Sequence, residues 1–177
     1  MTELQDQPEL KGAQRPRTAA RVAAVQALFQ IEQNDDRAES VVQQFMVHRF
    51  GTTLNNESYE EGYVPEPDTR LFISVVKQAV SHRSAILEQL GLTLPATWPV
   101  SRLDPVLRAL FLAALGEALT GDVPASVIIN EYMDIAHGFF SGEEPKLVNG
   151  VLDTAIKRLA TTEEKPASSE IEDNKAD

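Results

Sequence analysis

Apolar residues recur at helical spacing along most of the chain, and short polar stretches separate one periodic segment from the next. The first such segment predicts a helix from about Thr18 to Gln33, with Thr18 as its N-cap. A polar stretch then ends this helix, and Asp35 or Asp36 is expected to cap a second helix that reaches about Phe50. The pattern therefore predicts two helices before the first long polar stretch.

The polar segment 51–67 predicts a long connection rather than a domain boundary, because neither side alone is long enough for a core. Beyond it, apolar residues three and four positions apart predict a single long helix from the N-cap Asp68 to about Leu90. Gly91 and Pro95 are expected to end that helix.

The next periodic segment, one helix or a kinked pair, runs from Ser101 or Asp104 to Leu119. Because it is apolar around much of its circumference, we expect it at the centre of the fold. Two further helices follow, the first capped by Asp122, and an acidic hinge at 141–144 joins them. No alternating run is long enough for a strand, so the expected fold is all-α, with about six or seven helices.

Four polar residues interrupt the otherwise apolar pattern of the last two helices. They are Asn130, Glu131, Lys146 and Asn149. A buried or half-buried polar group costs free energy unless it is paired, so this series implies bonding partners. Gly150 lies in the middle of the last helix, where a glycine costs about 1 kcal/mol relative to alanine. It therefore predicts a close approach by a neighbouring helix.

The chain has 177 residues, of which 42% are hydrophobic, and this composition fits one globular domain with its own core. The absence of cysteine excludes a disulfide framework, a thiolate zinc site and a thiol nucleophile. No apolar run is long enough for a membrane helix, and the acidic, polar N-terminus is unlike a signal peptide. The expected location is the cytoplasm.

The net charge of −11 is unevenly distributed along the chain. The segment 161–177 carries six acidic residues against two lysines, whereas the segment 11–31 carries four cations and no acid. We expect a flexible basic and polar arm over residues 1–16, one helical domain over 17–160, and a disordered acidic tail over 161–177.

The basic segment is a candidate nucleic-acid contact. Arg17 and Arg21 are four residues apart and share one helix face, and further cations extend the charge into the arm. Phe29 offers a ring to an unstacked base. The candidate RNA contacts in this segment are Lys11, Arg15, Arg17, Arg21, Gln26 and Phe29. The alternative is an ordinary solvated helix start with Phe29 in the core.

Motifs for catalysis and cofactors are absent. The sequence has no phosphate-binding glycine loop, no dinucleotide-binding fingerprint and no serine in a nucleophile elbow. Glu131, Asp134 and His137 recur every three residues, but this spacing drifts around a helix and no second cluster of ligands accompanies it. The sequence therefore predicts no enzyme, no cofactor and no metal site.

Four segments together resemble the NusB family of bacterial transcription antitermination factors. They are AARVAAVQALFQ at 19–30, LDPVLRALFLAALGEAL at 103–119, DVPASVIINEYMDIAHGF at 122–139 and EPKLVNGVLD at 144–153. The resemblance covers about residues 15–160 and implies a compact helical protein of two perpendicular subdomains. It also implies binding of single-stranded boxA RNA together with NusE, a small-subunit ribosomal protein. That complex helps the transcription elongation complex to resist termination, notably on ribosomal RNA operons, without catalysis or a cofactor.

Carried over by position, the resemblance places Arg17, Arg21 and Phe29 at the RNA surface. Glu117 matches an acidic residue that contacts NusE, and the acidic hinge falls where the family joins its RNA and NusE surfaces. Lys146 is added to the expected RNA contacts on this basis. The expected partner contacts are Glu117, Glu143, Glu144 and Leu147.

The chain departs from the family pattern at several of these places. Thr18 and Ala19 stand where basic residues are frequent, Leu112 where arginine is common, Gly116 where tyrosine is usual and Leu147 where phenylalanine is common. A lost stacking ring removes about 1–3 kcal/mol per base. We therefore expect weak RNA binding by the protein alone and a large dependence on NusE.

Two alternatives remain open at the level of sequence. The diluted arginines and the excess of acid favour a helical protein–protein interaction module without direct RNA binding. Apolar surface intended for NusE would also allow a homodimer when the partner is absent.

Overall fold

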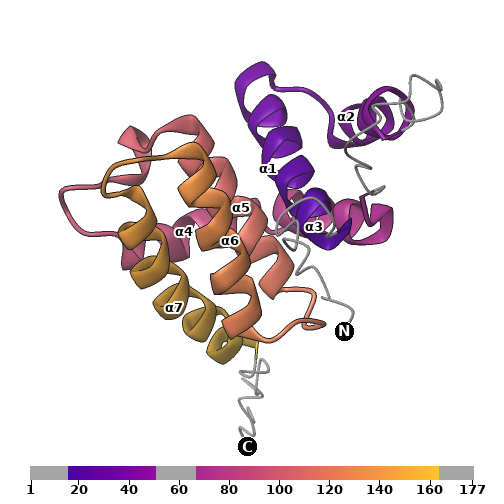
Figure 1. The fold of residues 1–177 in the computed structure, drawn as a ribbon. Coiled ribbons are helices and arrows are strands. Elements are labelled where there is room, and N and C mark those ends of the chain that lie inside the picture. Colours follow the sequence, from indigo (N-terminus) through magenta and orange to yellow (C-terminus); the bar gives the residue numbers. More distant parts are fainter. Residues whose placement is uncertain (1–15, 51–66, 164–177) are drawn as a thin grey trace, which may run out of the picture.

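The computed structural model describes residues 16–50 and 67–163, and every regular element in these ranges is helical (Figure 1). The seven α-helices of these ranges are α1 (Pro16–Asn34), α2 (Ala38–Gln44), α3 (Thr69–Ser81), α4 (Arg83–Thr93), α5 (Pro105–Ala118), α6 (Ala125–Phe139) and α7 (Glu144–Glu163). A π-helical turn, Phe45–Arg49, extends α2, and a 3-10 turn, Val100–Arg102, precedes α5. The all-α expectation is confirmed. None of these helices is long and apolar enough to cross a membrane.

Three expected segments fall largely outside this description. They are the arm before residue 16, the connection at 51–66 and the tail after residue 163. Lys11 and Arg15 of the candidate RNA surface belong to the first of them.

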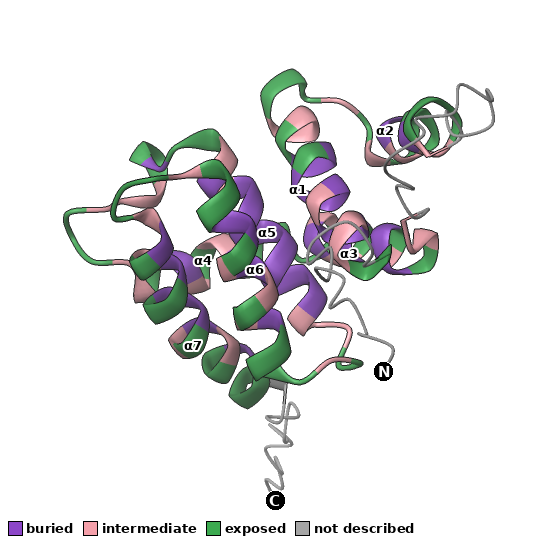
Figure 2. Cartoon of the chain, in the orientation of Figure 1, coloured by how far each residue is buried: buried purple, intermediate pink, exposed green. Residues whose placement is uncertain are grey.

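The α5 helix lies at the centre of the fold. It packs against α1 and α3 on one side and against α4, α6 and α7 on the other (Figure 1). Every residue from Leu107 to Glu117 except Arg108 is buried, as the continuous purple of α5 in Figure 2 shows. Its start is as the sequence predicts, because a carboxylate oxygen of Asp104 accepts a hydrogen bond of 2.8 Å from the backbone N–H of Val106.

The predicted long helix after residue 68 is two helices. Asp68 caps α3 as expected, since its side chain accepts from the backbone N–H of Leu71 at 3.0 Å. The helix ends at Ser81, however, and α4 begins at Arg83 after a break at His82. α3 packs on α1 and α5, whereas α4 packs on α5 and α7, so the chain changes partners at the break. The apolar spacing in the sequence continues across the break at His82 because both helices bury a face against α5.

The second helix starts later than predicted, and neither expected cap is used. Asp35 adopts a left-handed conformation with φ of 56°, which ends α1. The Asp36 carboxylate accepts from the side chains of Gln30 at 3.2 Å and Asn34 at 3.3 Å, so it closes the end of α1 instead. The N-cap of α2 is Arg37, whose side chain makes no capping bond.

Two further expected caps are wrong. α1 already begins at Pro16, which places Thr18 inside its first turn with its hydroxyl turned to another helix. α6 begins at Ala125 with Pro124 in the cap position, and Asp122 lies before it on the surface.

The close helix approach lies at a different glycine from the one predicted. A Cβ atom built on Gly150 would meet no atom within 4 Å, so that prediction is wrong. A Cβ atom on Gly116 would lie 2.9 Å from both the backbone nitrogen and the Cβ of Ala79. The crossing of α5 over α3 therefore requires glycine at position 116.

Most of the polar series in the last two helices faces solvent. Asn130, Lys146 and Asn149 are exposed, so they are not buried polar groups that require partners inside the fold, and the exposure of Lys146 is what a contact with RNA needs. Only Glu131 is turned inward, toward α1.

Candidate nucleic-acid interface

Arg21 and Glu117 form a buried ion pair between α1 and α5. The guanidinium donates from Nε at 2.9 Å and from Nη2 at 2.6 Å to the two carboxylate oxygens. Arg21 is 2% exposed and Glu117 is 0% exposed. Burial alone would lower the pKa of Arg21, but the hydrogen bonds and charge of Glu117 outweigh it and the pKa is raised.

This ion pair changes the roles expected of both residues. Arg21 was expected to contact RNA and Glu117 to contact NusE, yet in this structure they contact each other and neither reaches the surface. The spacing of Arg17 and Arg21 does put them on one helix face. The second turn of α1 is covered by α5 and α6, whereas its first turn is open, so only Arg17 is exposed.

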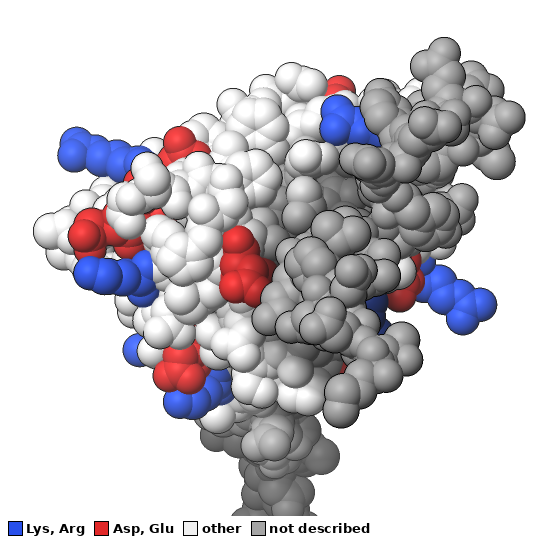
Figure 3. All heavy atoms as spheres, in the orientation of Figure 1, with Lys and Arg blue, Asp and Glu red and all other residues white. Residues whose placement is uncertain are grey.

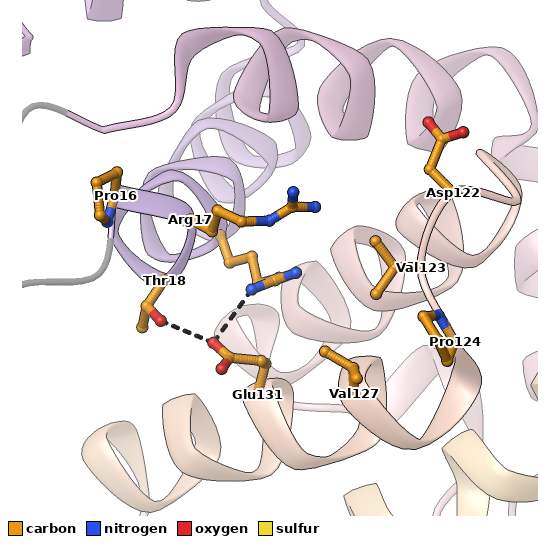
Figure 4. Close-up of a pocket in the computed structure, with 9 residues that line it drawn as sticks. Pro16, Arg17, Thr18, Asp122, Val123, Pro124, Val127 and Glu131 are labelled. Carbon is orange, nitrogen blue, oxygen red and sulfur yellow. Dashed lines mark hydrogen bonds and ion pairs between the residues drawn. The ribbon is translucent and has the colours of Figure 1, made fainter.

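Glu131 of α6 joins the same cluster from the other side. Its carboxylate accepts a hydrogen bond of 2.7 Å from the Thr18 hydroxyl and lies 3.2 Å from Nη1 of Arg21 (Figure 4). The Glu131 side chain is 15% exposed. One guanidinium therefore holds two carboxylates from two helices, and the cluster ties the start of α1 to both α5 and α6.

A cleft of about 480 Å³ opens above this cluster, between the first turn of α1 and the beginning of α6. Figure 4 shows the Arg17 side chain extending over the cleft toward Asp122 and Val123. Val127 contributes an apolar wall. Arg17 is exposed and forms no ion pair with any residue in the described part of the chain, so its charge is available to a ligand.

A second cleft, of about 430 Å³, lies at the other end of α1. Phe29 from α1 and Phe139 from the end of α6 both line it, at 36% and 44% exposure. Arg49 of the π-helical turn donates to the Gln26 side chain at 3.3 Å and stands 4.7 Å from the centre of the Phe45 ring. Rings, amides and a cation thus surround one hollow, with Gln26 and Phe29 both exposed as predicted for contacts.

Sequence reasoning missed Phe139 and Arg49. Phe139 was part of the family-like segment but had no assigned role, and Arg49 reaches α1 only because the π-helical turn packs against it. No spacing rule links positions 26, 49 and 139, so the sequence held no signal for this grouping.

The hinge residues lie at the opposite end of α6 from Arg17. Lys146 and Glu143 are exposed and 3.7 Å apart, an interaction worth little in solvent. Glu144 begins α7, and Leu147 is half-buried against the core. α6 has 15 residues, and at 1.5 Å per residue it separates the Arg17 cleft from the hinge by roughly 20 Å.

Tyr132 of α6 is fully buried beside the ion-pair cluster. Burial and the nearby charge of Glu117 raise its pKa well above the ordinary value of 10.0. Because the folded-state pKa is raised, the stability that neutral Tyr132 contributes is fully present below about pH 10. It is lost as the pH rises toward the folded-state pKa.

We therefore expect the protein to lose stability above about pH 10 more steeply than a Tyr132→Phe variant. Urea unfolding between pH 8 and 11 measures this, with both chains compared at each pH. If the free energies of unfolding of the two proteins change in parallel with pH, Tyr132 ionises at the same pH in the folded and the unfolded chain.

The fold and this surface define an all-α protein whose first helix carries an exposed cation near a buried ion-pair cluster at one end and an exposed aromatic ring at the other. The sequence model of the NusB family matches residues 18–157, and the chain belongs to that family. The transcription antitermination protein NusB of Gluconobacter oxydans is 50% identical over 153 residues, which cover 86% of this chain and 94% of that protein.

Solved structures agree with this fold. The solution structure of NusB from Aquifex aeolicus matches with a TM-score of 0.65 at 19% identity, covering 90% of this chain and 99% of that one. A chain in the crystal structure of a plectonemic RNA supercoil matches with a TM-score of 0.64 at 19% identity, covering 84% and 99%. At these identities the likeness concerns the fold alone.

Proposed function

We propose that this protein is a non-enzymatic transcription antitermination factor that binds boxA-type single-stranded RNA together with NusE. The pair would keep the elongation complex processive, notably on ribosomal RNA operons. Membership of the NusB family and relatives that are transcription antitermination proteins support the proposal. The fold is also found in a crystal structure that contains RNA.

The observation that carries the RNA part of the proposal is the set of exposed side chains at the two ends of α1. Arg17 stands at the start of α1 and Phe29 twelve residues further on. Twelve residues at 1.5 Å each place them about 18 Å apart along the helix axis, a span for a few nucleotides, and at 3.6 residues per turn about a third of a turn apart around it. The cation holds phosphates, which fixes the strand in place, and the ring stacks against a base. Gln26 lies between them with its amide beside the second cleft.

The hinge supplies the joint surface in this proposal. Lys146 provides a second exposed cation, and Glu143, Glu144 and Leu147 meet NusE beside it. Lys11 and Arg15 extend the cationic end beyond α1. Arg21 and Glu117 are not proposed as contacts, because each is buried against the other.

The charge distribution supports the proposed need for a partner. On the face shown in Figure 3, charged side chains are scattered and largely peripheral, and they do not form a continuous basic surface. The chain as a whole carries −11. Few phosphate contacts and a repulsive net charge give weak binding, so NusE completes the surface that reads the bases.

Fluorescence anisotropy with a labelled boxA oligonucleotide tests the proposal. We expect weak binding by the protein alone and a marked gain on adding NusE. If three or four phosphates are neutralised, the slope of log K against log salt is about −2 to −3, at roughly −0.7 per contact. Arg17→Ala is expected to reduce that slope by about 0.7.

Lys157→Ala is the matched control for this experiment. It removes one exposed positive charge from α7, where Lys157 pairs with Asp153 at 3.1 Å. It is expected to leave the salt slope unchanged. An RNA affinity that does not increase when NusE is added would overturn the proposal.

The burial of Arg21 gives weight to one other function. With Arg21 withdrawn, Arg17 is the one exposed arginine in the described length of α1. A helical protein–protein interaction module fits a surface with so little positive charge. In the same experiment such a module is expected to bind NusE but to show no binding of boxA RNA, whether NusE is present or absent.

A further inference from the structure

We propose that Thr18, Arg21 and Glu131 are positioning residues for RNA binding, which fix the first turn of α1, and with it Arg17, over the cleft beside α6. This inference rests on the proposed RNA-binding function. It assigns to Arg21 a role through other residues in place of a direct contact with RNA.

The geometry fixes both the position and the rotation of α1. The Arg21 guanidinium is planar, and its nitrogens reach Glu117 on α5 and Glu131 on α6 at once. Two carboxylates on different helices hold a planar group in one orientation, so α1 cannot turn about its axis without breaking one of the two contacts. The Thr18 hydroxyl, one turn earlier, adds a second attachment to Glu131 at 2.7 Å.

The first turn of α1 needs such an attachment. The opening N–H groups of a helix have no partners within the helix, and this end frays easily. α1 has no acidic residue in its first turn to offset the positive end of its dipole. Glu131 brings that negative charge from α6 to Thr18. Glu131 of the neighbouring helix therefore takes the place of an acidic residue in the first turn of α1.

Arg17 depends on this attachment because it precedes Thr18 directly. Figure 4 shows the two side chains leaving the same turn in different directions, Thr18 toward Glu131 and Arg17 over the cleft. A cation on a fixed turn loses less conformational freedom when it binds a phosphate than one on a frayed turn. The cluster therefore raises RNA affinity without contributing a phosphate contact.

The Thr18→Val variant separates positioning from contact. Valine has the shape of threonine but no hydroxyl, so it removes only the bond to Glu131. We expect the affinity for a boxA oligonucleotide, measured with NusE present, to fall about three- to tenfold, less than the full loss of a charge-assisted hydrogen bond, because Thr18 acts on the RNA only through Arg17. The salt slope should stay the same because no phosphate contact is lost. Thr18→Ser keeps the hydroxyl and should retain most of the affinity.

A second measurement does not depend on RNA. Trypsin cleavage after Arg17 requires the first turn of α1 to open, so its rate reports that opening. Glu131→Gln leaves the cleaved sequence unchanged and weakens both attachments, and it is expected to speed this cleavage several-fold. Thr18→Val should act in the same direction.

The outcomes are distinct. If the unmodified chain shows no boxA binding, the proposed function fails, and the cleavage rates still test whether the cluster holds the turn. Unchanged cleavage in both variants overturns the positioning role. A Thr18→Val chain whose RNA affinity equals that of the unmodified protein, or whose salt slope falls by about 0.7 as for a lost phosphate contact, does so as well.

Discussion

Replacing Arg21 with alanine is expected to lower the free energy of unfolding by about 3–5 kcal/mol, because it leaves a buried charge without its partner. Glu117 is 0% exposed, so in this fold its carboxylate relies on the guanidinium rather than on water. Glu131, on the other side, loses its contact at 3.2 Å as well. Urea unfolding followed by circular dichroism measures the change, provided the slope with denaturant stays constant.

A paired replacement provides the control for this result. In Arg21→Met combined with Glu117→Leu, both charges are removed and the volume is largely kept, which is often neutral or stabilising for a buried pair. We expect this double variant to recover the part of the loss that comes from Glu117, whereas the part that comes from Glu131 remains. Lys157→Ala breaks a solvent-exposed pair and should change stability by less than about 1 kcal/mol. If Arg21→Ala also lowers the free energy of unfolding by less than about 1 kcal/mol, the cluster is solvated and adds little to stability.

Gly116→Ala is expected to destabilise the protein by about 1–3 kcal/mol, because the added methyl group overpacks the crossing of α3 and α5. The new Cβ would lie 2.9 Å from the backbone nitrogen of Ala79, and backbone cannot move aside as a flexible side chain can. Thermal and urea unfolding of the variant measure the effect.

Gly150→Ala is the matched substitution in another helix. A Cβ at that position meets nothing within 4 Å, so the helix propensity of alanine should add about 1 kcal/mol of stability. Opposite signs for the two variants are the expected result. Two stabilising substitutions would show that α3 and α5 separate readily, and that the close approach at Ala79 does not restrict position 116.

The close approach of position 116 to Ala79 bears on one departure expected from the family resemblance. From the family resemblance a tyrosine was expected where this chain has Gly116, and its absence suggested a lost ring and weaker binding. In the structure, position 116 is buried at the α3 crossing and faces Ala79. The glycine belongs to the packing of this core, and restoring the ring would require α3 to move.

The sequence determined the features that depend on neighbours along the chain. Apolar periodicity predicted the all-α fold, and a helix apolar on every side predicted the central position of α5. Asp68 and Asp104 were recognisable caps because a cap bonds only to the next few backbone N–H groups. The family segments also stood in the sequence itself, and the family match over residues 18–157 confirmed them.

Only the tertiary structure decided which polar groups face inward. Arg17 and Arg21 occupy the same helix face by their spacing, yet one stands over an open cleft and the other lies at 2% exposure between two carboxylates. Spacing fixes the direction of a side chain around its own helix, but not which helix lies opposite. That depends on contacts between residues about 100 positions apart, such as Arg21 with Glu117. The exposed cation, the buried cluster beneath it and the ring of Phe139 beside α1 all follow from that packing.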